Sequence, residues 1–262
     1  MNRLTALQWT GRAVIGFVVA CGWAAGSAHA NGNGEDTTFV VAAFQESAPG
    51  AGDFDAHYLG TIPPFEIAET AEEFYGLADG CYMGSYVRLA LEPDRSLCTF
   101  VTDSNGIAFM TVHDDIDDPD GGRVEMVIEL DGNASGASWI VQNADPGGGH
   151  DVYIGEPGDS FFAACHEWGT CCTDGEILGY LTGALEVAFV DVDVDPDTPC
   201  FEGLDSWVLI GAYGKLVPLV LEDGRRVRFE IIPTCSTDVN GDGSVDIADL
   251  LHMLATWGAC VR

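Results

Sequence analysis

Short apolar runs separated by turn residues constrain the fold of residues 38–232 more than any other feature of this sequence. Each run is rich in β-branched or aromatic residues, and Gly, Asp, Asn and Pro stand between the runs, a pattern typical of strands joined by turns. The predicted strands are Thr38–Phe44, Tyr82–Leu91, Ile107–Val112, Arg123–Leu130, Ser138–Gln142, Ser160–Ala164, Leu185–Asp193, Ser206–Ile210, Leu216–Leu221 and Arg226–Ile232. Many short strands with frequent turns favour a mainly β domain over 38–232, an antiparallel β-sandwich or jelly roll.

Two local patterns add detail to this prediction. Asp223-Gly224 lies between the last two predicted strands, and this dipeptide indicates a type I′ turn, so we expect the two strands to form a hairpin. Thr70 and Glu73 have the spacing of a capping box, in which each residue satisfies a backbone amide at the start of a helix. We therefore expect one short helix over Thr70–Leu77.

The first 30 residues have the features of a secretory signal peptide. Two arginines precede the apolar stretch Ala13–Ala20, and Ala28-His-Ala30 is an A-x-A cleavage signal. We therefore predict that residues 1–30 are removed, that 31–37 form a flexible segment, and that the protein is secreted or displayed at the cell surface. The alternative is a lipoprotein anchored through Cys21, which ends a lipobox-like tetrapeptide. No later run is long and apolar enough to span a bilayer, so we expect no membrane span.

The cysteine count agrees with export. Beyond Cys21 the chain has an even set, Cys81, Cys98, Cys165, Cys171, Cys172, Cys200, Cys235 and Cys260, which in an exported chain predicts disulfide bonds. Cys235 and Cys260 bracket the C-terminal segment, and we expect them to pair. That bond would close a loop of about 25 residues and contribute roughly 3 kcal/mol through chain entropy. The remaining six cysteines allow about fifteen connectivities, among which the sequence does not choose.

The charge of the chain limits its partners. All 42 acidic residues lie beyond residue 30, together with eight of the ten lysines and arginines. Residues 31–262 therefore carry a formal charge of −34. A surface of this kind repels nucleic acid and anionic membranes and attracts cations. We expect no nucleic-acid binding, and a cation such as calcium is favoured.

Residues 238–249 have the spacing of a calcium loop. Calcium takes about six to eight oxygen ligands, and a twelve-residue loop supplies them from positions 1, 3, 5, 7, 9 and 12. Position 6 is Gly243, where the chain must turn sharply. The apolar residues Ile247, Leu250, Leu251 and Leu254 then recur at helical spacing. The expected ligands are Asp238, Asn240, Asp242, Ser244 through its backbone carbonyl, Asp246 and Asp249.

The segment 235–260 resembles a type I dockerin repeat, an EF-hand-type calcium loop with Asp at position 12 and a short helix after it. The resemblance covers about 26 of the 262 residues, and it implies that Ca²⁺ is the bound ion. Dockerins that bind cohesin contain two such repeats, whereas this chain has one. Positions 10 and 11 are Ile247 and Ala248, which lack the hydroxyl groups that often contact cohesin in that family. We therefore expect a small calcium-binding loop-helix unit that does not dock onto cohesin.

Other groups of polar residues have weaker patterns. Cys165-His166 with Cys171-Cys172 supplies ligand types that zinc uses, but structural zinc sites are built from two separated pairs, and disulfides are the preferred interpretation. His113-Asp114 and His150-Asp151 each place a carboxylate beside an imidazole. Successive side chains on a strand point to opposite faces, so structural or surface roles are expected for both pairs.

Two acidic stretches are further calcium candidates, Asp114–Asp120 and Asp191–Asp197. Acidic side chains on one face of a strand repel one another unless an ion or water screens them. The alternative for both stretches is a solvated surface without a bound ion. The sequence does not decide between these interpretations.

The sequence points to binding more than to catalysis. It contains no G-x-S-x-G, P-loop, H-E-x-x-H or C-x-x-C pattern. We expect a secreted calcium-binding protein whose body binds carbohydrate or acts in adhesion or matrix, with an extracellular polysaccharide or a cell-surface protein as partner. The alternative is a secreted polysaccharide hydrolase with a calcium-binding tail, because dockerin repeats are frequently attached to such enzymes. A hydrolase requires a concave site with converging carboxylates or a histidine-assisted nucleophile.

Overall fold

The computed structural model describes residues 39–76, 89, 91–114, 121–131, 136–143, 151–169, 173–191, 201–202, 204–233 and 251. The chain divides into two compact units, one formed by Thr37–Thr234 and the other by Met1–Asp36 with Cys235–Arg262. Almost all described residues belong to the first unit. The predicted signal peptide, the segment 31–37 and the calcium loop 238–249 lie outside the described residues.

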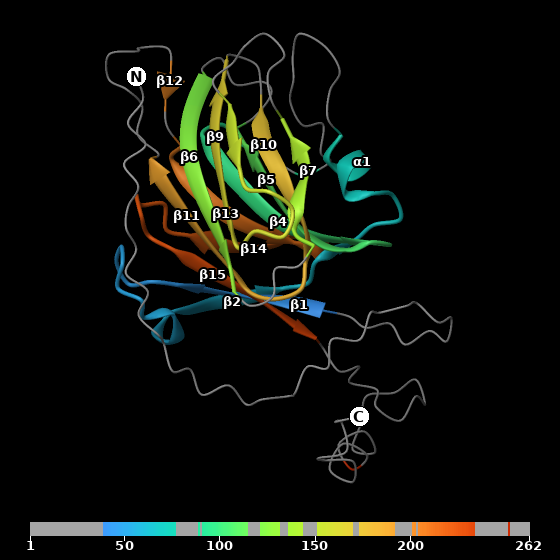
Figure 1. The fold of residues 1–262 in the computed structure, drawn as a ribbon. Coiled ribbons are helices and arrows are strands. Elements are labelled where there is room, and N and C mark those ends of the chain that lie inside the picture. The colour runs from blue at the N-terminus through green and yellow to red at the C-terminus, as the bar shows by residue number, and fades with distance from the viewer. Residues whose placement is uncertain are drawn as a thin grey trace. The chain divides into compact units, whose positions relative to one another are not determined.

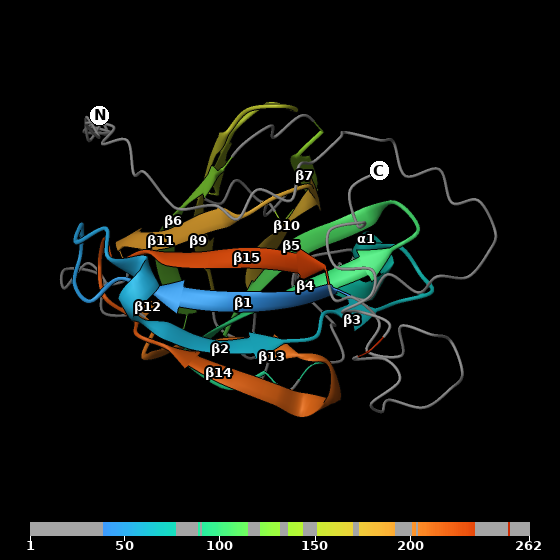
Figure 2. The same cartoon turned by 90° about the horizontal axis from the view of Figure 1, so that it is seen from below.

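The first unit is a sandwich of two β-sheets (Figure 1). One sheet has eight strands, and Figure 2 shows four of its members, β11, β15, β1 and β2, side by side in this order. Along the sheet the strands are β2 (Tyr58–Ile62), β1 (Phe39–Gln45), β15 (Val227–Pro233), β11 (Leu185–Asp191), β6 (Gly121–Leu130), β9 (Phe161–Trp168) and β8 (Val152–Ile154), with β12 (Phe201–Glu202) paired to β6.

The other sheet has seven strands and packs against the first. Along it run β14 (Lys215–Leu219), β13 (Ser206–Gly211), β4 (Arg95–Asp103), β5 (Gly106–His113), β10 (Asp174–Leu181) and β7 (Ser138–Gln142), with β3 (Phe65–Glu66) paired to β4. Most neighbouring strands are antiparallel, but β13 and β3 each run parallel to β4, and β12 runs parallel to β6. The sandwich is confirmed, and its sheets are mixed rather than purely antiparallel.

Alternating side chains fill the space between the sheets. Buried apolar residues of both inner faces form one cluster, as expected for strands whose successive side chains point to opposite faces. Phe100 of β4, Phe109 of β5 and Phe229 of β15 lie at its centre, with ring centroids 5.3–5.8 Å apart. Because Phe229 comes from the opposite sheet, these contacts join the two layers directly.

The outer face of the seven-stranded sheet is covered by the helix α1 (Ala71–Tyr75). Thr70 accepts a hydrogen bond from the backbone of Glu73, whose carboxylate accepts one from the Thr70 amide, so the predicted capping box is present. The helix ends at Gly76, in a left-handed conformation. Tyr75 is fully buried and its hydroxyl accepts a hydrogen bond from Asn143. Two short 3-10 turns, Phe54–Ala56 and Ala212–Gly214, complete the described elements.

The strand predictions hold for most of the sandwich, with several omissions. Runs predicted as strands overlap β1, β5, β6, β7, β9, β11, β13, β14 and β15. The run Tyr82–Leu91 lies outside the described residues except for Leu89 and Leu91, neither of which is in a strand. No predicted run covers β2, β3, β4, β8, β10 or β12. Two of them, β4 and β10, flank β5 and lie at the middle of their sheet.

The predicted hairpin between β14 and β15 is wrong. A turn forms at Asp223-Gly224, where Arg225 donates its amide to the carbonyl of Glu222, but it is not of type I′, because Gly224 has a positive φ of +70° and Asp223 does not. The strands on either side nevertheless belong to different sheets. The side-chain amide of Gln45 both donates to and accepts from the backbone of Val220, at 2.7 and 2.9 Å. These bonds occupy the groups through which the chain after β14 could pair with a neighbouring strand.

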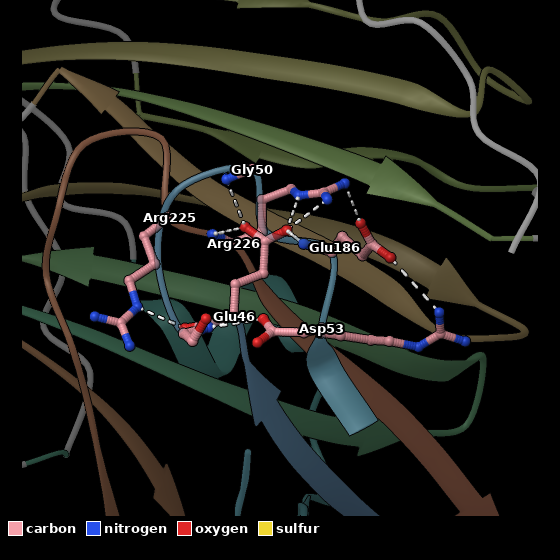
Figure 3. Close-up of polar contacts among 9 residues, drawn as sticks. Glu46, Gly50, Asp53, Glu186, Arg225 and Arg226 are labelled. Atoms are coloured by element: carbon pink, nitrogen blue, oxygen red, sulfur yellow. Dashed lines mark hydrogen bonds and ion pairs between the residues drawn. The ribbon is translucent and has the colours of Figure 1, made fainter. Parts of the chain in front are cut away.

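Glu46 fixes the loop that follows β1 to the start of β15. Its carboxylate is fully buried and accepts hydrogen bonds from the amides of Gly50 and Gly52 and from the guanidinium of Arg226, at 2.6–3.2 Å. Arg226 also donates to Glu186 of β11 at 2.9 Å. Figure 3 shows the Glu46 carboxylate between the Gly50 amide and the Arg226 guanidinium. Segments about 180 residues apart in the chain are thus joined by one carboxylate.

The cysteines that the structure describes are free thiols. Cys98 is buried on the inner face of β4, where its Sγ donates to the carbonyl of Val208, and Cys165 is partly exposed on β9. Burial raises the pKa of the Cys98 thiol far above its ordinary value. The expectation that both take part in disulfides is therefore not met. The other predicted disulfide cysteines lie outside the described residues.

The substitution Glu46→Gln tests the contribution of this buried carboxylate. We expect it to lower the free energy of unfolding by roughly 2–3 kcal/mol, because hydrogen bonds to a buried charge are lost and Arg226 loses its main partner. Urea unfolding measures this change. The control is Glu222→Gln, whose exposed pair with Arg225 should contribute less than about 1 kcal/mol. Equal effects of the two substitutions would contradict the larger contribution that we expect from the buried Glu46 carboxylate.

The contribution of Glu46 should also depend on pH. Burial alone would raise the pKa of Glu46, but hydrogen bonds from Arg226 and the Gly52 amide outweigh it and lower the pKa below its ordinary value. The stabilisation is therefore fully present above the ordinary pKa of the unfolded chain and is lost as pH falls through the lower folded pKa. Unfolding free energies of wild type and Glu46→Gln should converge in that acidic range. A difference independent of pH would contradict this linkage.

Candidate functional site

Polar side chains replace the apolar core at one end of the sandwich. In the register of the seven-stranded sheet, His113 of β5 stands between Ser96 of β4 and Asp174 of β10. Two residues further along the same strands, Thr111 lies opposite Glu176. Residues directly opposite one another share a face of a sheet, so all five side chains face the inner space. Each is at most 3 % exposed.

The opposite sheet adds His166, from β9. Its Nδ1 lies 3.1 Å from Oδ1 of Asp174, and its Nε2 contacts Oε2 of Glu176. The rings of His166 and His113 have centroids 4.9 Å apart. A histidine from one sheet thus meets two carboxylates and a second histidine from the other. We call His113, His166, Asp174 and Glu176 the inner polar cluster.

Most members of the inner polar cluster have one polar atom held by a neighbour. Nδ1 of His113 lies 3.1 Å from the hydroxyl of Ser96, and the hydroxyl of Thr111 donates to Oε1 of Glu176 at 2.7 Å. Nε2 of His113 is buried without a hydrogen-bond partner among the described residues, while Nε2 of His166 and Oε2 of Glu176 contact one another. A buried polar group left without a hydrogen bond costs about 1–3 kcal/mol. One ligand atom from each of His113, His166 and Glu176 lies within 4.8 Å of the others.

The pKa values of the two histidines of the cluster shift in opposite directions. Burial alone would lower the pKa of His166, but Asp174 and Glu176 outweigh burial and raise this pKa well above its ordinary value. Burial, reinforced by the charge of His166, lowers the pKa of His113 well below its ordinary value. Burial also raises the pKa of Asp174 to about 6, against the opposing effect of His166. The two carboxylates thus favour the protonated form of His166, and burial favours the neutral form of His113.

Trp168 closes the cluster on one side. Its indole ring stacks on His113, with centroids 5.8 Å apart and planes 18° apart, and its Nε1 donates to Asp114 at 2.7 Å. Gly122 of β6 lies against the same indole, where an added Cβ would come within 2.2 Å of a ring carbon. A side chain at position 122 would therefore displace Trp168 from His113.

The geometry limits what the inner polar cluster can do chemically. Imidazole and carboxylate groups can transfer protons or bind a divalent cation. His113, His166 and Glu176 all have 0 % exposure, so a substrate in solution has no direct path to them in this conformation. The cluster is thus closed to large substrates, and a small ion is the ligand that matches its size.

The candidate sites identified from sequence have different positions in the structure. His166 faces the inner space, whereas its neighbour Cys165 is partly exposed beside Arg123 and Glu125. Cys165 and His166 cannot bind the same metal ion, because their side chains lie on opposite faces of β9. Cys171 and Cys172 lie outside the described residues. Adjacency of these four residues in sequence therefore does not define a site.

The histidine–aspartate neighbours also separate. His113 is in the cluster, while Asp114 accepts hydrogen bonds from the Asp94 amide and the Trp168 indole. Asp114 is buried, so it is a structural residue and not part of a solvated acidic turn. Asp151 accepts a hydrogen bond from the Glu167 amide. His150 and residues 115–120 lie outside the described residues.

The calcium ligands expected from sequence lie in the other unit. Asp238, Asn240, Asp242, Ser244, Asp246 and Asp249 lie outside the described residues, as do residues 192–197 of the second acidic stretch. Leu251, which belongs to the helix predicted after the loop, is in helical conformation. The calcium site therefore stays a prediction from sequence.

A pair of threonine substitutions measures the hydrogen bond that Glu176 receives. Thr111→Val keeps the shape of the side chain but removes the hydroxyl that donates to the buried carboxylate. We expect it to lower the free energy of unfolding by about 1–3 kcal/mol. The matched control is Thr99→Val, which removes a buried hydroxyl donating to the neutral carbonyl of Ile210. Chemical denaturation should show the larger loss for Thr111→Val, and a larger loss for the control would contradict the expected contribution of this hydrogen bond.

Comparison with known proteins does not identify the chain. No protein-family model matches it, and neither the curated proteins nor the solved structures contain a match. Within the described residues, no helix has the length and apolar character needed to cross a membrane. Functional inference therefore rests on the residues and geometry of this chain.

Proposed function

We propose that the protein is an exported calcium-binding protein whose C-terminal loop, residues 238–249, holds one Ca²⁺. The observation that carries this proposal is the register of oxygen ligands in the loop, which fills positions 1, 3, 5, 7, 9 and 12 around a glycine at position 6. Asp238, Asp242, Asp246 and Asp249 would repel one another strongly without a cation. The loop belongs to a dockerin-like unit over 235–260, which a Cys235–Cys260 disulfide would close.

The composition of the chain supports the same proposal. A signal peptide over residues 1–30 would export the protein to an environment where calcium is abundant and thiols are oxidised. A formal charge of −34 on residues 31–262 raises the local concentration of cations around the protein. Calcium bound only to the folded loop stabilises that loop by mass action.

The sandwich is proposed to bind an extracellular polysaccharide or a cell-surface protein. Its described histidine–carboxylate cluster is closed to solvent, whereas the polysaccharide hydrolase considered above needs catalytic carboxylates in an open, concave site. Tyr213, at the tip of the β13–β14 hairpin, is 98 % exposed. Tyrosines at such positions supply contact area at binding surfaces. A closed polar cluster together with an exposed tyrosine supports a binding role for the sandwich.

Calcium titration calorimetry on residues 31–262 tests the first part of the proposal. We expect one site in the tail, and we expect its heat signal to disappear in the double variant Asp242→Ala/Asp246→Ala, which removes two ligands. At a calcium concentration of about 100 times Kd, the ion should stabilise the tail by about 2.7 kcal/mol. Hydrogen exchange should therefore show that chelation lowers protection in residues 238–260.

Two outcomes would separate this proposal from its alternatives. The control Glu69→Gln removes an exposed acid of the sandwich and should leave the tail site unchanged. A signal that persists in the double variant would place calcium elsewhere, in the acidic stretches 114–120 or 191–197. No calcium binding by the wild-type chain would overturn the proposal.

A further inference from the structure

We propose that His113, His166 and Glu176 form a binding site for one divalent transition-metal ion between the two sheets, with zinc as the best match. The three residues come from β5, β9 and β10, so the ion would join the two layers of the sandwich. One ligand atom of each lies within 4.8 Å of the others, and all three residues are fully buried. This site is separate from the calcium loop and does not depend on it.

One atom without a partner indicates where the ion would lie. Nε2 of His113 is buried without a hydrogen-bond partner among the described residues, although buried polar atoms are almost always hydrogen-bonded in folded proteins. Nε2 of His166 and Oε2 of Glu176 contact one another as an ion pair. A cation that accepts a lone pair from each of the three atoms would give Nε2 of His113 a partner and take the place of that ion pair.

The other polar atom of each residue has a polar neighbour. Nδ1 of His166 lies 3.1 Å from a carboxylate oxygen of Asp174, a contact of the kind found behind metal-bound imidazoles. Ser96 holds Nδ1 of His113, and Thr111 donates to Oε1 of Glu176. These contacts leave Nε2 of both histidines and Oε2 of the glutamate as the ligand atoms available to an ion.

An ion pair without metal explains only part of this arrangement. Asp174 and Glu176 can hold a protonated His166, and that interaction accounts for three of the four residues. It leaves Nε2 of His113 without a partner, although the two imidazole rings are 4.9 Å apart. A shared cation would use both rings.

The ligand types select the class of ion. Two imidazole nitrogens and one carboxylate oxygen suit zinc and its neighbours in the first transition series, while calcium takes oxygen ligands. Zinc bonds of about 2.0–2.2 Å to these atoms would separate the ligand atoms by roughly 3.3 Å. His166 and Glu176, now in direct contact, would move apart, and His113 would approach. Three protein ligands leave one position for water.

The test measures zinc bound to residues 31–262 by equilibrium dialysis and elemental analysis, with calcium present throughout to saturate the tail. Zinc is supplied both to the folded protein and during refolding, because the site is closed to solvent. We expect one zinc per chain in the wild type. His113→Phe and Glu176→Gln each remove a ligand with little change in shape and should weaken zinc binding at least about 100-fold. Ser96→Ala removes a support for His113 and should weaken it about 10- to 100-fold.

Three controls locate the ion. His57→Ala removes an exposed histidine, Cys165→Ser removes the partly exposed thiol beside His166 in sequence, and Asp242→Ala/Asp246→Ala removes calcium ligands of the tail. All three should retain zinc with unchanged affinity. Loss of zinc in Cys165→Ser would move the site to the cysteines and overturn the proposal. Failure of calcium binding in the wild type would overturn the proposed function and leave this result unaffected.

Cobalt provides a readout that does not depend on the folding of a variant. Wild-type protein refolded with Co²⁺ should show the visible absorption of a four-coordinate nitrogen–oxygen site, without a thiolate-to-metal band. Near-UV circular dichroism, which reports on Trp168 beside His113, establishes whether each variant is folded. Absence of stoichiometric zinc and cobalt in the refolded wild type, or unchanged zinc affinity in a folded His113→Phe, would overturn the proposal.

Discussion

The register of three neighbouring strands decides which residues meet inside the sandwich. Since side chains alternate along a strand, the pairing of β5 with β4 and β10 places His113 in one inward-facing row with Ser96 and Asp174. A shift of the register by one residue would turn all of these side chains to the outer face and replace them with apolar ones. The phenylalanine core in the middle of the same strands opposes such a shift, so apolar packing holds the polar residues in place.

The local parts of the fold were predictable because they depend on neighbours in sequence. The capping box of Thr70 and Glu73 and the strand Ser138–Gln142 are local patterns, and the structure contains both. The strand β10 was not predicted because Gly175 and Gly179 interrupt its apolar pattern. The hairpin failed for a different reason, since the direction of the chain after a turn depends on distant groups such as Gln45.

The inner polar cluster could not be assembled from adjacency. His113 and Asp114 are neighbours in sequence, as are His166 and Cys165, and in both pairs the two members have different environments in the structure, as expected from the alternation of side chains along a strand. The true partners lie across strands, at separations that sequence does not reveal. One signal was available: Thr111 and His113 are polar residues two positions apart on the inward face of an apolar strand. Polar residues at such spacing indicate that polar side chains lie among the apolar ones between the two sheets.

Hard and borderline cations require different surroundings, and this chain contains candidate ligands of both kinds. The carboxylates of a strongly acidic surface attract calcium. Each exposed carboxylate binds the ion only weakly, because water and other carboxylates offer the ion similar oxygen ligands and salt screens the attraction. Nitrogen ligands and burial favour a different ion, because imidazole holds zinc in preference to calcium and the closed core excludes bulk water. A chain with a formal charge of −34 therefore cannot select a transition metal by charge alone. Selection requires ligands that surface carboxylates do not supply, and the two inward-facing imidazoles have that chemistry.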